Sequence, residues 1–209
     1  MQLHKSFRRI GFCDQTPFLS NGTIRHNIIG FSDFNEKRYR EVLVATMLNV
    51  DLAALPSGEM TNVGSNGITL SGGQKQRVSL ARALYLQSDL LILDDIFSGL
   101  DADTEEQVFQ RVFGSDGLAR RRNCTVILMT HSVKHLPAAD HVVALSTEGA
   151  IAEQGTFPEL MAQDGYIRGL GIKSDGSEAS SERLDLTGDP QRPQAELMRQ
   201  ATTEWLLVA

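Results

Sequence analysis

Short apolar runs and helix-spaced apolar positions alternate along this chain. The apolar segments Ile10–Cys13, Leu90–Leu93 and Thr125–Thr130 predict strands, and the last two are typical of strands buried on both faces of a parallel sheet. Residues Val142–Leu145 and Ile151–Ala152 predict a short hairpin. Because predicted strands alternate with predicted helices, the pattern indicates an α/β fold with a mostly parallel core sheet.

Three helices are predicted between these strands. Apolar residues at helical spacing indicate a helix near residues 35–49. Ser71 followed by Gln74 is a capping-box sequence, which predicts that a helix begins there. Asp103 and Glu106 have the same spacing and predict the start of a further helix, which carries an apolar face. These helices supply the layers that cover the predicted sheet.

The composition changes after residue 172. Residues 173–194 are rich in Ser, Gly, Asp, Glu and Pro, which predicts a disordered linker. Residues 195–208 carry apolar side chains whose spacing predicts a short helix. We therefore expect a domain over residues 1–172, with a helical subdomain at about 18–88, and an acidic, largely disordered tail over residues 173–209.

Composition and charge exclude several classes of protein. The chain has 209 residues, of which 41% are apolar, enough for one domain with a core. Its net charge of -6 argues against a nucleic-acid partner, because phosphate contacts need clustered Lys and Arg. The two cysteines show no metal-ligand spacing and no disulfide framework. No signal peptide opens the chain, and no apolar stretch reaches the ~20 residues that a membrane span needs.

The strongest chemical signal is the sequence Leu-Ser-Gly-Gly-Gln over residues 70–74. Two glycines and a capping serine present backbone N–H groups and a hydroxyl at a helix N-terminus, where the helix dipole favours an anion. An ordinary capped helix has the same local chemistry. The literal sequence decides the interpretation, because it is identical to the signature of ATP-binding-cassette (ABC) ATPases.

The resemblance to this family extends over roughly residues 7 to 172, through five motifs in the family's order. Each residue alone has a plainer explanation, as a surface polar group, a structural histidine or a helix cap. Their joint order favours the family. The matching positions are Gln15 of the Q-loop, Ser71, Gly72, Gly73 and Gln74 of the signature, Asp94 and Asp95 of the Walker B region, Asp101 of the D-loop, and His131 of the switch.

The resemblance implies a P-loop NTPase-like (RecA-like) core sheet with an inserted helical subdomain. It implies ATP and Mg²⁺ as cofactors, with Asp94 and Gln15 at the metal. Asp95 and His131 would act in catalysis, and Gln15, residues Ser71 to Gln74 and Asp101 would contact the nucleotide. The implied partners are a second nucleotide-binding domain and the transmembrane domains of an exporter. The domain would then lie on the cytoplasmic side of a membrane.

The residues in and around several of these motifs resemble those of the first nucleotide-binding domain of multidrug-resistance-associated (C-type) exporters. Two departures from the family pattern affect function. The phosphate-binding G-x-x-x-x-G-K-[ST] sequence (Walker A) is absent, so we expect an N-terminally truncated domain that lacks this loop and the strands before it. Asp95 stands where active sites carry glutamate. Its side chain is shorter by one methylene, about 1.5 Å, and a misplacement of ~1 Å can cost roughly 10²-fold in rate.

Several functional hypotheses stay open at this point. The first is an ATPase that drives solute export as part of an ABC transporter, with a weak or inactive site in this chain. The second is a non-catalytic, ATP-dependent dimerisation or regulatory module that completes the ATP site of a partner. A remnant without independent activity is the third. A chromosome-structure or DNA-repair cassette is disfavoured, because no long coiled coil separates Gln15 from Ser71.

Overall fold

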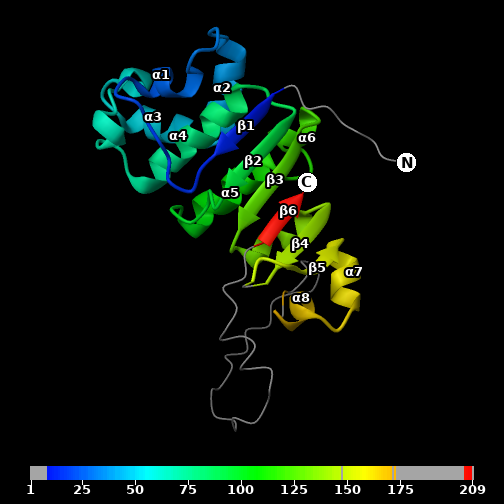
Figure 1. Cartoon of the computed structure of the whole chain (residues 1–209). Coiled ribbons are helices and arrows are strands. Elements are labelled where there is room, and N and C mark those ends of the chain that lie inside the picture. The colour runs from blue at the N-terminus through cyan, green and yellow to red at the C-terminus, as the bar shows by residue number, and fades with distance from the viewer. Residues whose placement is uncertain (1–8, 147, 171, 173–204, 209) are drawn as a thin grey trace.

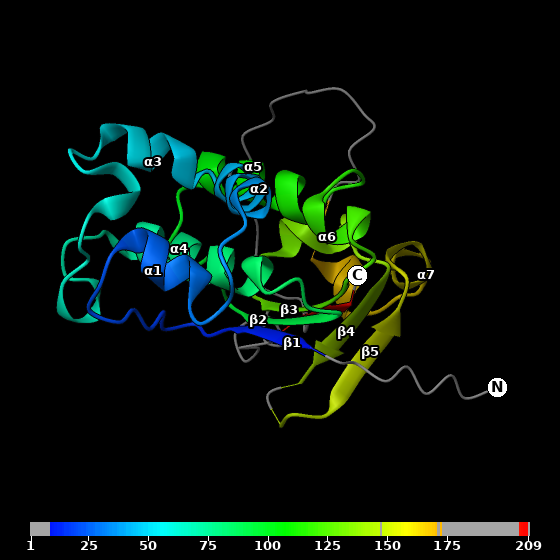
Figure 2. The same cartoon turned by 90° about the horizontal axis from the view of Figure 1, so that it is seen from above.

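The computed structural model describes residues 9–146, 148–170, 172 and 205–208. Within these ranges the chain forms a six-stranded sheet in the order β1-β2-β3-β6-β4-β5. Helices α1, α3 and α4 lie beside one end of the sheet in both views of the molecule (Figures 1 and 2). The fold is a mixed α/β fold of the P-loop NTPase-like type, as the sequence predicts.

Three parallel strands form one half of the sheet: β1 (Ile10–Cys13), β2 (Leu90–Asp94) and β3 (Thr125–Thr130). Cys13 lies opposite Leu93, and Asp94 lies opposite Met129. All three predicted strands are confirmed. Because they run in parallel, their carboxyl ends meet at one edge of the sheet, where the Q-loop, Walker B and switch residues follow.

Antiparallel strands form the other half. The predicted hairpin is confirmed as β4 (His141–Leu145) and β5 (Ile151–Gly155). Strand β6 (Trp205–Val208) lies between β3 and β4 and pairs with both. The predicted helix over residues 195–208 is therefore wrong for residues 205–208, while its first part lies outside the described residues. The predicted linker, residues 173–194, also lies outside them.

The segment between β1 and β2 contains four α-helices and two short 3-10 turns. The single helix predicted near residues 35–49 is divided at Met47, whose left-handed backbone (φ 58°) cannot continue a right-handed helix. The α4 helix begins directly after Ser71, as predicted. The elements are α1 (Ile24–Ile29), α2 (Glu36–Ala45), α3 (Leu48–Ala54), η1 (Gly58–Met60), η2 (Ser65–Gly67) and α4 (Gly72–Tyr85).

The remaining helices follow β2. The N-cap of α5 is Asp101, whose carboxylate accepts a hydrogen bond from the Thr104 N–H. The prediction that Asp103 caps this helix is wrong, because Asp103 already lies in its first turn. The elements are α5 (Ala102–Val112), α6 (Leu118–Arg121), η3 (Val133–Ala138), α7 (Phe157–Ala162) and α8 (Tyr166–Gly169).

The core lies between the parallel strands and the helices that cover them. Val78, Ala81 and Tyr85 of α4 are fully buried, together with the β2 residue Leu93. Burial also raises the pKa of the Cys13 thiol to about 11. No helix in the described part of the chain combines the length and the apolar character needed to cross a bilayer.

Candidate functional site

The signature loop is closed by reciprocal hydrogen bonds. The Ser71 hydroxyl oxygen accepts a hydrogen bond from the Gln74 N–H at 3.2 Å, and the Gln74 side-chain oxygen accepts one from the Ser71 N–H at 3.0 Å. The predicted capping box is therefore confirmed. The N–H groups of the first helical turn, at Gly72 and Gly73, have no partner within the helix itself.

The two signature glycines have different surroundings. A Cβ atom built on Gly73 would lie 2.8 Å from the Gly99 carbonyl oxygen, so glycine is needed there for packing within the chain. A Cβ atom on Gly72 would meet nothing within 4 Å. Packing within the described residues therefore does not explain glycine at position 72, and the backbone there has room for close approach of a ligand.

The Q-loop and Walker B residues meet at the carboxyl edge of the sheet. The Gln15 amide nitrogen donates a hydrogen bond to Asp95 Oδ2 at 3.0 Å. Asp95 has a left-handed backbone (φ 41°), and its N–H donates to the Met129 carbonyl of β3 at 2.9 Å. The Ser98 hydroxyl donates to the Asp95 carbonyl at 3.0 Å. These bonds hold the Asp95 carboxylate against Gln15.

Asp94 and His131 lie at the same edge. Asp94 is the last residue of β2 and lies opposite Met129 of β3. His131 follows Thr130, the last residue of β3, and is exposed. Parallel neighbouring strands thus bring Gln15, Asp94, Asp95 and His131 to one edge, where a hydrogen bond joins Gln15 directly to Asp95.

The D-loop, residues 98–101, connects this edge with the signature loop. Hydrogen bonds from the Thr104 N–H and hydroxyl lower the pKa of the Asp101 carboxyl. Gly99, two residues earlier, packs against Gly73. An open hollow lies where these loops meet, and its lining includes Gln15, Phe18, Gly72, Lys75, Ser98 and Gly99. The structure therefore brings Q-loop, signature and D-loop residues to one surface.

Sequence reasoning missed a cluster next to the switch histidine. Glu105 of α5 accepts hydrogen bonds from the Ser132 hydroxyl at 3.0 Å and contacts His135 Nε2 at 2.8 Å. The His135 ring is buried and stacks on Phe109, with centroids 3.7 Å apart. Burial lowers the pKa of His135, an effect that Glu105 opposes. No local pattern indicates this cluster, because its members are about thirty residues apart in the chain.

The residues at these loops have the chemistry needed to hold the phosphates of ATP and a Mg²⁺ ion. The open amides at Gly72 and Gly73 fit a phosphate group. Among the described residues, no cluster of three or more His, Cys, Asp or Glu side chains could hold a metal ion. Magnesium nevertheless fits the edge residues Asp94 and Gln15, since it is usually held by one or two carboxylates and completed by phosphates and water.

The fold and the loops at its sheet edge define the chain as a nucleotide-binding α/β domain. Residues 1–98 match the family model described as "ABC transporter". Over 199 residues, the chain is 61% identical to the ABC-type transporter braE of Annulohypoxylon truncatum, covering 95% of the chain and 13% of braE. It is 42% identical over 203 residues to the ABC multidrug transporter B of Aspergillus fumigatus, covering 97% of the chain and 14% of that protein.

The chain therefore belongs to the ATP-binding-cassette family and is a nucleotide-binding domain of the kind found in its transporters. Membership in this family implies that the domain binds ATP. The chain spans only about an eighth of the length of the relatives that it matches.

Proposed function

We propose that this domain binds ATP and Mg²⁺ together with a second nucleotide-binding domain, and that ATP binding and hydrolysis drive solute export across a membrane. In this proposal the signature loop, Ser71 to Gln74, closes over ATP held mainly by the partner. Asp94 and Gln15 hold Mg²⁺, which neutralises phosphate charge. Asp95 and His131 are the candidate catalytic residues, and Asp101 lies at the interface between the domains.

One observation carries the proposal more than any other. The N-terminus of α4 presents the amides of Gly72 and Gly73, and the space that a side chain would fill at Gly72 is open. A helix N-terminus with free amides favours a phosphate, both by hydrogen bonding and by the helix dipole. In this proposal the signature loop at residues 70–74 is therefore the surface that contacts the phosphates.

The proposal is tested by ATP-dependent association. The chain is mixed with a purified nucleotide-binding domain of a relative such as braE, and the complex is quantified by sedimentation with ATP, with ADP and without nucleotide. We expect a complex with ATP and Mg²⁺ only. Gly72→Asp should abolish the complex without unfolding the chain, because the new carboxylate repels the triphosphate while its Cβ atom has nothing within 4 Å. Gly72→Ala is the matched uncharged variant.

Association that is equally strong without nucleotide, or that survives Gly72→Asp, would contradict the proposal. The unfolding midpoint of each variant is measured in parallel. A variant that unfolds at the wild-type midpoint and still fails to associate locates the defect at the loop surface. The Asp140→Asn variant serves as a further control, since its exposed ion pair with Arg120 lies outside the loops discussed here.

A second candidate function is supported by the surroundings of Asp95. This carboxylate accepts a hydrogen bond from Gln15 and is shorter than the glutamate found in active cassette sites. We propose as the alternative that the domain is an ATP-dependent dimerisation or regulatory module, which completes the ATP site of a partner and hydrolyses ATP slowly or not at all at its own Walker B.

Turnover measurements separate the two candidates. ATP hydrolysis is compared between the full transporter that contains this domain and its Asp95→Glu variant. If Asp95 limits a degenerate site, the added methylene should raise turnover by on the order of 10-fold or more. Unchanged turnover would contradict the idea that Asp95 is the cause of slow hydrolysis.

We propose that the domain is the first nucleotide-binding domain of a C-type exporter and that it lies on the cytoplasmic side of the membrane. Residues 1–172 would form the domain, with the helical subdomain at about 18–88. Residues 173–209 would form a linker. The similarity to the multidrug transporter B of Aspergillus fumigatus supports an exporter of this general kind.

A further inference from the structure

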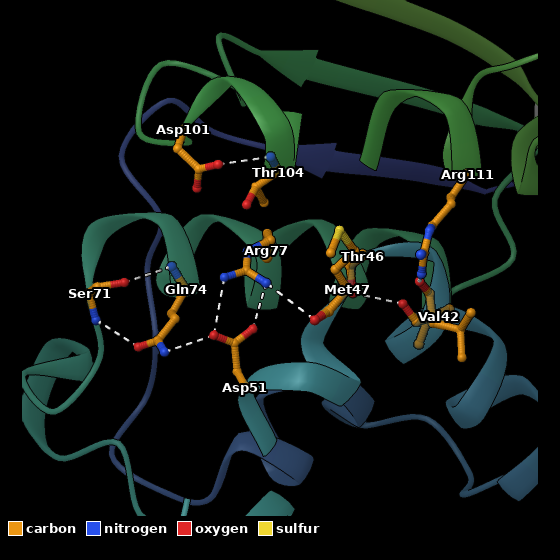
Figure 3. A network of polar contacts seen from close by, with 11 residues as sticks. Val42, Thr46, Met47, Asp51, Ser71, Gln74, Arg77, Asp101, Thr104 and Arg111 are labelled. Atoms are coloured by element: carbon orange, nitrogen blue, oxygen red, sulfur yellow. Dashed lines mark hydrogen bonds and ion pairs between the residues drawn. The ribbon is translucent and has the colours of Figure 1, made fainter. Parts of the chain in front are cut away.

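Asp51 belongs to none of the motifs described above, yet its carboxylate contacts two residues of the signature helix (Figure 3). Asp51 lies on α3, and both partners lie on α4. Its Oδ2 atom accepts a hydrogen bond from Arg77 Nη1 at 2.5 Å, and its Oδ1 atom accepts from Arg77 Nη2 at 3.2 Å. The same Oδ1 atom accepts from the Gln74 side-chain nitrogen at 2.9 Å.

The charge of Asp51 fixes the orientation of the Gln74 amide. An ionised carboxylate only accepts hydrogen bonds, so Gln74 must present its NH₂ group to Asp51. The amide oxygen of Gln74 then points to the Ser71 N–H, to which it is hydrogen-bonded at 3.0 Å. Reversal of the amide would place its oxygen against the carboxylate and its NH₂ group against the Ser71 N–H. Both contacts would be repulsive.

Arg77 ties this arrangement to the neighbouring turn. Its Nη1 atom also donates to the carbonyl oxygen of Met47, the left-handed residue between α2 and α3, at 3.3 Å. The side chains of Arg77 and Asp51 are only 11% and 18% exposed. Such a shielded ion pair is weak evidence of a role in stability, because desolvation of both charges offsets much of their attraction. The third contact of Asp51, with Gln74, indicates a different role.

We infer that Asp51 is a positioning residue of the signature loop. By holding the Gln74 amide in one orientation, Asp51 keeps the Ser71 N–H bonded to Gln74 Oε1. The loop is then held in the shape that presents the amides of Gly72 and Gly73 outward. Gln74 contributes through the shape of the loop, because both ends of its amide are already engaged. This inference rests on the proposed binding of a partner's ATP at the loop.

The experiment compares two substitutions that both remove the ion pair. Asp51→Leu removes the acceptor of Gln74 as well, whereas Arg77→Gln leaves Asp51 and its hydrogen bond to Gln74 in place. A purely structural ion pair predicts the same result for both. The inference predicts that the Ser71 amide proton exchanges with solvent about 10-fold faster in Asp51→Leu, as for loss of one hydrogen bond, and at nearly the wild-type rate in Arg77→Gln.

The double variant Asp51→Leu, Arg77→Leu covers the case in which Asp51→Leu leaves an uncompensated charge and does not fold. Replacement of both members of a shielded ion pair by apolar residues is often neutral for stability. The inference predicts fast Ser71 exchange in this variant together with a near-wild-type unfolding midpoint. Glu36→Gln is the control, since it removes a carboxylate from an exposed ion pair on α2.

ATP-dependent association with the partner domain supplies the functional result. We expect about 10-fold weaker association for Asp51→Leu or the double variant, and unchanged association for Glu36→Gln. Unchanged Ser71 exchange in the variants that lack Asp51 overturns the inference, and so does unchanged association once Ser71 exchange has risen. Absence of ATP-dependent association in the wild-type chain instead contradicts the proposed function itself.

Discussion

Gly72 and Gly73 are adjacent in the chain but differ in what each contacts. Gly73 packs against the Gly99 backbone and Leu100, whereas the space beside Gly72 is open. Packing within the chain therefore constrains Gly73 but not Gly72 among the described residues. Alanine substitutions at the two positions separate these constraints.

Gly73→Ala should destabilise the fold by about 1–3 kcal/mol, because its methyl group would overlap the Gly99 carbonyl oxygen. Gly72→Ala should leave the free energy of unfolding within about 0.5 kcal/mol of the wild-type value. Urea denaturation of the two variants measures both. Equal destabilisation by the two substitutions would show that the close contact at Gly73 is absent in solution.

His135 should make the stability of the domain depend on pH. Burial lowers its pKa below the ordinary value of 6.5, so the unfolded chain binds the proton more readily than the folded one. The resulting contribution is complete above pH 6.5 and is lost as the pH falls from 6.5 through the folded pKa. The free energy of unfolding should therefore fall more steeply below pH 6.5 in the wild type than in His135→Gln. Parallel pH profiles would contradict this assignment.

The start of α5 shows how local signals can compete within one element. Asp101 and Asp103 both precede acidic or polar residues at capping distance, and the sequence alone favours Asp103. The structure selects Asp101, which accepts the Thr104 N–H at 2.9 Å. The position of the cap is set by the turn after β2, where Leu100 donates its N–H to the Phe97 carbonyl.

Asp101→Ala should lower the unfolding midpoint through loss of the cap, whereas Asp103→Ala should leave the midpoint nearly unchanged. Thermal unfolding of the two variants under identical conditions provides the comparison. A larger loss of stability in Asp103→Ala than in Asp101→Ala would show that Asp103 is the N-cap, as the sequence predicts.

Elements with a clear local pattern of apolar residues could be predicted from the sequence. Elements whose secondary structure depends on pairing with distant segments could not. A short continuous apolar run such as Leu90–Leu93 suits a strand buried on both faces of a parallel sheet, and the prediction of this strand succeeds. Trp205–Val208 carries a pattern that also suits a helix. It forms a strand because β3 and β4 each offer an edge to pair with, and sheet pairing between distant segments outweighs local propensity.

At the scale of the whole molecule, parallel topology explains why the candidate site was partly predictable. Residues that follow parallel strands must meet at one edge, so Gln15, Asp94 and His131 could be grouped from motif order alone. The Asp51 contacts could not be predicted, because they join positions 23 and 26 residues apart on separate helices. Only the packing of α3 against α4 brings these side chains together.

The central claim is that the amides at the start of α4 bind phosphate groups of ATP. Proton–nitrogen NMR spectra of the labelled chain in the presence of its partner domain test it directly. The account predicts that the amide resonances of Gly72 and Gly73 shift when ATP and Mg²⁺ are added, and that AMP, which lacks the β- and γ-phosphates, leaves them in place. Unshifted Gly72 and Gly73 resonances in a sample saturated with ATP and partner would contradict it.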